Sequence, residues 1–142
     1  DCIIELALNI LVARHSPGES LTSAEDTRNF LKLLLHCERN ETFGCIYLTA
    51  QHKVIEHGTI CTGTIDAATV YPRVVVQKCL EYNAAAVLFY HNHPSGNCTP
   101  SQADQQITRK LKDALSLIDI RVLDHMIVGG SDSSSMAELG MI

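Results

Sequence analysis

An apolar segment, a polar loop and the start of a helix follow one another in residues 84–104, which read AAAVLFYHNHPSGNCTPSQAD. The seven residues 84–90 are all apolar, and they are bounded by Asn83 and by the polar loop. Such a run is typical of a strand that is buried on both faces, because it has no solvent face on which polar residues would alternate. The sequence therefore predicts a strand at the centre of a sheet.

Two histidines follow directly after this apolar run. Side chains two positions apart in an extended chain point the same way, so His91 and His93 are expected to aim at one point. Two neutral imidazoles that converge in this way make half of a tetrahedral zinc site, with bonds of roughly 2.0–2.1 Å.

The next helix supplies a carboxylate as a third ligand. We expect this helix over 100–116, with Thr99 and Gln102 forming a capping box at its start. Asp104 shares the buried stripe of the helix with Ile107, because three-residue steps stay on one face. A buried carboxylate is costly unless it is paired or binds a metal. Three protein ligands leave a fourth position for water, which is the arrangement of catalytic zinc sites.

Strand and helix patterns alternate along the rest of the chain. Strands are expected at 42–50, 54–62 and 118–128, with a short edge strand in the tail after Gly129. A helix is expected to begin at Pro72. Its inward-facing residues are predicted to be Val75, Val76, Cys79 and Leu80. The alternation predicts an α/β sandwich around a mixed sheet.

The first 37 residues are expected to form a helical lead-in to a domain over 38–142. Apolar residues recur at helical spacing within 2–14, and Thr22 with Glu25 has the spacing of a capping box. Polar residues interrupt the first apolar run and no basic segment precedes it, so we expect neither a signal peptide nor a membrane span. The chain does not begin with methionine, which is compatible with a piece of a longer protein.

Composition bounds the compartment and the partners. The 142 residues fit one domain, and their net charge of −5 comes without a basic stripe, so tight nucleic-acid binding by this domain is not expected. The six cysteines include no C-x-x-C pair and several lie in apolar segments. Reduced thiols in the cytoplasm are the better interpretation, rather than a disulfide framework.

The loop and its surroundings resemble a known family. The pattern H-x-H-P, followed by an aspartate that S-x-x precedes, resembles the JAMM (MPN-plus) metalloprotease signature. HNHPSG and TPS, with GTID upstream and DHMIVGG downstream, resemble its bacterial RadC-like branch, historically labelled a DNA repair protein. The resemblance covers residues 38–142 and implies a zinc-dependent protease. It also implies the family's three-layer α/β sandwich, which is related to that of cytidine deaminases.

The resemblance also implies roles for single residues. His91, His93 and Asp104 match the family's metal ligands. Ser101 matches the serine that stabilises the developing oxyanion, although a serine there can equally serve as a helix cap. Glu41, directly before the first predicted strand, matches the general base.

The assignment of the base and three departures from the pattern stay open. Glu38 and Glu56 are weaker matches for the base, and a solvated loop carboxylate is the plainer interpretation of Glu41. Asn92 stands where eukaryotic relatives carry Ser or Thr, although it is usual in the RadC-like branch. Cys98 lies where a charged residue or proline is expected. His125 is interpreted as a structural or rim residue rather than a fourth ligand.

Three functions from different classes follow. The leading hypothesis is a zinc metallohydrolase that cleaves a peptide or isopeptide bond with a glutamate base, and a homo-oligomer is compatible with it. Nucleobase deamination needs H-x-E with P-C-x-x-C, which this chain lacks. The alternative is a non-catalytic DNA-repair or mobile-element accessory domain that retains a metal site. The contiguous HNH triplet is a coincidence, because HNH nucleases are named for residues scattered over a ββα unit.

Overall fold

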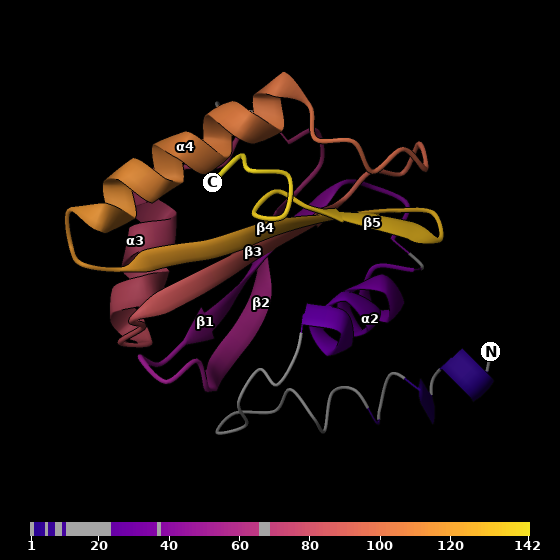
Figure 1. Cartoon of the computed structure of the whole chain (residues 1–142), viewed down its shortest axis with the longest axis horizontal. Helices are drawn as coiled ribbons and strands as arrows, with labels where there is room; N and C mark the ends of the chain where they lie inside the picture. The colour runs from indigo at the N-terminus through magenta and orange to yellow at the C-terminus, as the bar shows by residue number, and fades with distance from the viewer. Residues whose placement is uncertain (1, 5, 8–9, 11–23, 37, 66–68) are drawn as a thin grey trace.

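The computed structural model describes residues 2–4, 6–7, 10, 24–36, 38–65 and 69–142 (Figure 1). In the predicted lead-in, the described residues before position 11 are helical, and helix α2 spans Ala24–Leu34. Thr22, and with it the capping box predicted before α2, lies outside the described residues. The domain boundary at residue 37 stays a prediction.

Five strands form one mixed sheet in the order β2-β1-β3-β4-β5 (Figure 1). Their bounds are β1 Thr42–Leu48, β2 Val54–Thr62, β3 Ala86–Asn92, β4 Arg121–Gly129 and β5 Asp132–Ser135. β3 pairs with β4 in parallel, and the other neighbours are antiparallel. The middle strand is therefore the predicted one, although it begins at Ala86 rather than at residue 84 and extends beyond the apolar run to Asn92, and the expected edge strand in the tail is β5.

Helices cover both faces of this sheet, so the domain has three layers (Figure 1). Helices α3 (Pro72–Glu81) and α4 (Gln102–Ser116) pack on one face, and α2 packs on the other. Val87 and Phe89 of β3 belong to the core under α3 and α4. Leu88 and Tyr90 belong to the core against α2. The predicted three-layer α/β sandwich with a central mixed sheet is confirmed.

The inward face of α3 is narrower than predicted. Val75 and Cys79 are buried and Val76 is partly buried, whereas Leu80 is 60% exposed. One residue turns a helix by about 100°, so the position after Cys79 faces away from the sheet. The prediction that Leu80 faces inward was wrong.

The strand predicted from residue 118 begins at Arg121. Helix α4 is followed by a turn in which Asp119 has a left-handed φ of 59°. Leu117, just after the helix, is 85% exposed. The predicted start at residue 118 was wrong because Ile118, like Leu117, is apolar and continues the strand pattern, although both residues lie before the strand.

No helix in the described part of the chain is both long enough and apolar enough to cross a bilayer.

Gly44 makes room for the Tyr90 ring on the central strand. A Cβ at position 44 would lie 2.3 Å from Cζ of Tyr90, whereas a Cβ at Gly58 on the neighbouring strand would meet nothing within 4 Å. We expect Gly44→Ala to lower the free energy of unfolding by about 1–3 kcal/mol, because the core must shift. Gly58→Ala is expected to stay within about 0.5 kcal/mol of wild type. Urea unfolding of both variants measures this, and equal stabilities would contradict it.

Candidate metal centre

Three side chains from β3, the loop after it and α4 converge on one point. His91 Nε2 lies 2.9 Å from His93 Nε2. The carboxylate of Asp104 places Oδ1 3.1 Å from His91 Nε2 and Oδ2 3.1 Å from His93 Nε2. Ligand atoms bound to tetrahedral zinc at roughly 2.0–2.1 Å are about 3.3 Å apart. Among the described residues, these three form the group of donors that is close enough to share an ion.

The alternation of side chains along β3 directs the His91 side chain toward α4. His91 continues the series of Val87 and Phe89, whose side chains face the core under α3 and α4. His93 follows the last residue of β3, and its N–H donates to Val128 O of β4 at 2.8 Å, so the ladder extends to the second histidine. The parallel pairing of β3 with β4 therefore fixes the backbone that carries both imidazoles.

The first turn of α4 positions the carboxylate. Ser101, not Thr99, is the N-cap, and the helix begins at Gln102 rather than Pro100. Ser101 Oγ accepts from the Asp104 N–H at 3.1 Å, and Asp104 Oδ2 accepts from the Ser101 N–H at 2.8 Å. The capping box predicted at Thr99 and Gln102 was wrong by two residues: Ser101 and Asp104, which have the same spacing, form it instead. The hydrogen bonds of this capping box also orient the Asp104 carboxylate.

The electrostatics of the site favour positive charge. Burial alone would raise the pKa of Asp104, but hydrogen bonds with His91 and His93 hold it well below its usual range. The hydrogen bond with Asp104 raises the pKa of His93 above its ordinary value against the effect of burial. The Asp104 side chain is 3% exposed and that of His91 1%. A buried anion beside two imidazoles needs a cation or shared protons.

Loop contacts settle the tautomer of His93. His93 Nδ1 lies 2.7 Å from Asn97 O. A carbonyl only accepts, so Nδ1 carries a proton, and in the neutral ring Nε2 then offers its lone pair to an ion; without an ion, Nε2 can take up a proton and donate to Asp104. Ser134 Oγ donates to Cys98 O at 2.5 Å, which ties the same loop to β5. The Cys98 side chain is half-buried and is not in the group of three donors.

Glu41 lies beside the site through strand pairing. β1 and β3 are antiparallel with Phe43 opposite His91, so the chain continues from there to place Glu41 near His93. Asn92 reinforces this: Oδ1 accepts from Thr42 N at 2.6 Å, and Nδ2 donates to the backbone just before Glu41 at 3.1 Å. The Glu41 charge contributes to the raised pKa of His93, after the Asp104 hydrogen bond.

The other glutamates that matched the base less well differ in their position: Glu38 lines the hollow that reaches His93, and Glu56 lies away from it. Glu38 is exposed, and Glu56 lies within β2 opposite Tyr47, near the far end of β1. Glu41 is half-buried, and its Oε2 accepts from the Ile65 N–H at 2.8 Å, whereas its Oε1 has no hydrogen bond to another residue in the described part of the chain.

His125 and Thr108 lie directly behind His91. His125 is fully buried and therefore does not lie on a rim. Its Nε2 is 2.6 Å from His91 Nδ1, and its Nδ1 is 2.5 Å from Thr108 Oγ1. Burial, followed by the nearby His91, holds the pKa of His125 well below its ordinary value. Sequence reasoning missed Thr108, although it stands four residues after Asp104 on the same buried stripe of α4.

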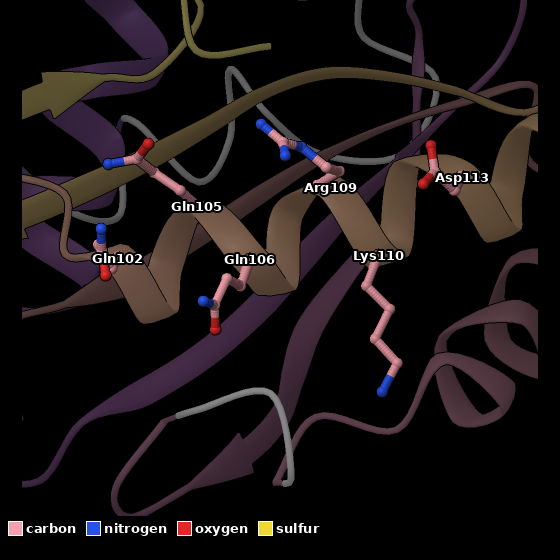
Figure 2. Close-up of a pocket in the computed structure, with 6 residues that line it drawn as sticks. All are labelled: Gln102, Gln105, Gln106, Arg109, Lys110 and Asp113. Carbon is pink, nitrogen blue, oxygen red and sulfur yellow. The ribbon is translucent and has the colours of Figure 1, made fainter.

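Two surface hollows differ in their relation to this site. One of about 500 Å³ lies on the solvent side of α4 (Figure 2), away from the metal ligands. It is lined by Gln102, Gln105, Gln106, Arg109, Lys110 and Asp113. Another, of about 300 Å³, reaches His93 and also includes Leu35, Glu38 and Val128. The second hollow therefore borders the ligand cluster at His93.

The model of the RadC-like JAB domain matches residues 21–141. The chain belongs to this family. Curated relatives carry the name UPF0758 protein, which states no activity. The relative from Ectopseudomonas mendocina is 49% identical over 97% of this chain and 62% of its own length. The one from Stutzerimonas stutzeri is 50% identical over the same shares. The one from Vibrio cholerae is 50% identical over 99% of this chain and 88% of its own length. The chain thus spans about 62% of several curated relatives.

Membership bears on the chemistry at a coarse level. The JAB domain family includes metalloproteases. The cluster of two histidines and one aspartate has the composition of a metal site of such domains. The roles of the single residues remain predictions.

Gly129 allows the ligand-bearing loop to pass over β4. A Cβ there would lie 2.7 Å from Cys98 N and 2.9 Å from the carbonyl carbon of Asn97. Gly129→Ala should displace the carbonyl that orients His93, so we expect Zn²⁺ affinity to fall about ten-fold or more. Competition with a chromogenic chelator measures it, with Gly58→Ala as the matched control. A folded Gly129→Ala protein of wild-type affinity would contradict the role given to this loop.

Proposed function

We propose that the domain is a zinc-dependent hydrolase that cleaves an amide bond in a peptide or isopeptide. The observation that carries this proposal is the convergence of His91, His93 and Asp104, with neighbouring donor atoms 2.9–3.1 Å apart. Family membership supports it, because the JAB domain family includes metalloproteases.

The donor set favours zinc over other common ions. Two imidazoles with one carboxylate are the ligands of catalytic zinc sites, whereas Ca²⁺ and Mg²⁺ prefer sets of oxygen ligands. The half-buried His93 adjoins a hollow, so the cluster is not sealed in the interior. A bound zinc ion would polarise the scissile carbonyl and lower the pKa of the attacking water.

Glu41 acts as general base in this proposal. Its Oε2 is held by the Ile65 N–H, and its other oxygen takes the proton of the attacking water and passes it to the leaving amine. The Asn92 amide fixes the adjoining backbone on both sides of Glu41. Positioning of this kind matters because a base must lie within hydrogen-bond reach of the proton that it removes.

Ser101 donates to the developing oxyanion in this proposal. Its Oγ accepts the Asp104 N–H in the capping box, and the hydroxyl proton is not used in that bond. The helix-cap interpretation and the catalytic one are therefore compatible: the cap holds Oγ beside Asp104, and the proton is left for substrate.

We also infer a cytoplasmic location. The described cysteines at positions 2, 45, 61, 79 and 98 are all free thiols. Free thiols persist in the reducing environment of the cytoplasm.

Glu41→Gln separates catalysis from metal binding. We expect it to keep wild-type zinc content and to lower turnover at least about 100-fold, because the amide cannot take a proton. Glu81→Gln, at the exposed end of α3 and outside the hollow that reaches His93, is the matched control and should keep full activity. The assay is a panel of fluorogenic peptides and isopeptide-linked conjugates, with zinc measured by plasma mass spectrometry.

Two results would contradict this scheme in different ways. Turnover that survives in Glu41→Gln would remove Glu41 as the base. Zinc-loaded wild type that cleaves nothing in the panel would favour the accessory domain, in which the metal site serves stability or binding.

A further inference from the structure

We propose that His125 and Thr108 are positioning residues that keep a proton on Nδ1 of His91, so that Nε2 is the nitrogen that His91 offers to the ion. This inference rests on the proposed zinc site. It concerns a relay of three buried groups that neither the family match nor the proposed mechanism assigns.

The relay begins at a hydroxyl whose proton is already engaged. Thr108 Oγ1 donates to the main-chain carbonyl of Asp104 at 2.7 Å, with Met136 Sδ at 3.7 Å as a further acceptor. Each of these partners only accepts, and a hydroxyl has one proton. Thr108 Oγ1 must therefore act as the acceptor toward His125 Nδ1, 2.5 Å away.

The direction of each later bond follows. His125 Nδ1 carries the proton of the neutral ring, so His125 Nε2 is bare and can only accept. The proton in the 2.6 Å contact between the two rings then belongs to His91 Nδ1. In the neutral His91 ring, Nε2 is consequently the nitrogen without a proton, and this atom, 3.1 Å from Asp104, is the one that can bind the ion. The contacts therefore form a closed chain that begins at the main-chain carbonyl of Asp104 and ends at its carboxylate. It passes through Thr108, His125 and His91 in that order.

The surroundings hold His125 in this orientation. The Phe43 ring meets the His125 ring edge-on, with centroids 5.5 Å apart at 87°, and the Phe89 ring does so at 6.3 Å and 77°. The His125 carbonyl accepts from Met136 N at 3.1 Å. His125, Thr108, Phe43 and Phe89 are all buried, so water does not compete for the ring nitrogens.

The contacts that orient His91 differ from those that orient His93. His93 receives its tautomer from the carbonyl of Asn97 in a surface loop. His91 receives it from two side chains in the core, one on α4 and one on β4. Partners of this kind typically change metal affinity 10- to 100-fold.

The test combines nitrogen-15 NMR of the histidine rings with zinc affinity. In metal-free wild type we expect the proton on Nδ1 of both His91 and His125. Zinc should then bind His91 through Nε2 without changing the His125 tautomer. A proton on His125 Nε2, or zinc bound through His91 Nδ1, would overturn the inference. This readout needs no variant and no substrate.

Variants add the energetic test, measured by chelator competition. His125→Leu removes the acceptor, and zinc affinity is expected to fall about 10- to 100-fold. His125→Gln keeps an amide oxygen that can accept from His91, and should recover part of that loss. Thr108→Val should weaken zinc binding, whereas Thr108→Ser should not. Wild-type affinity in folded His125→Leu would overturn the inference.

Failure of the zinc site itself is distinguishable from failure of the relay. Wild type that binds no zinc while both rings carry the proton on Nδ1 would end the proposed function and leave the tautomer assignment supported. Wild type that binds zinc with the opposite tautomers would do the reverse.

Discussion

The structure depends on the cost of burying the Asp104 carboxylate. Its side chain is 3% exposed and lies 3.1 Å from the Nε2 atoms of two histidines. An isolated ionised carboxylate in such a place would be prohibitively unfavourable. Three contacts offset this cost. The Ser101 N–H donates to the carboxylate within the helix cap, and both imidazoles lie against it. An ion bound among the three side chains would neutralise its charge. In this account the fold supplies a negative, preorganised cavity, and the metal completes it.

The sheet makes this arrangement possible through its two-residue period. The same alternation that sends Phe89 under α4 sends His91 there too, and the parallel partner β4 carries the backbone past the end of β3 to His93. The site is therefore built at the carboxyl end of a central strand, where loops can approach while the strand stays rigid. The two histidines are oriented by different environments, one by a loop carbonyl and the other by core side chains.

Much of this was accessible from the sequence, for identifiable reasons. The uninterrupted apolar run is typical of a strand that is covered on both faces, and the spacing of His91, His93 and Asp104 then predicted that their side chains converge. What the sequence could not give depends on competition between similar signals. Both Thr99 and Ser101 can begin a capping box, and only packing of the loop chose Ser101. The relay depends on a contact between Thr108 of α4 and His125 of β4, which are 17 residues apart in the sequence. No local sequence pattern predicts a contact over that separation.

Anomalous scattering at the zinc absorption edge tests the central claim most directly, with crystals of the protein grown in the presence of Zn²⁺. The account predicts one strong difference peak, at bonding distance from His91 Nε2, His93 Nε2 and one oxygen of Asp104, with a further position open toward solvent. A map without a peak among these three side chains, or an ion held at a different place, would contradict it.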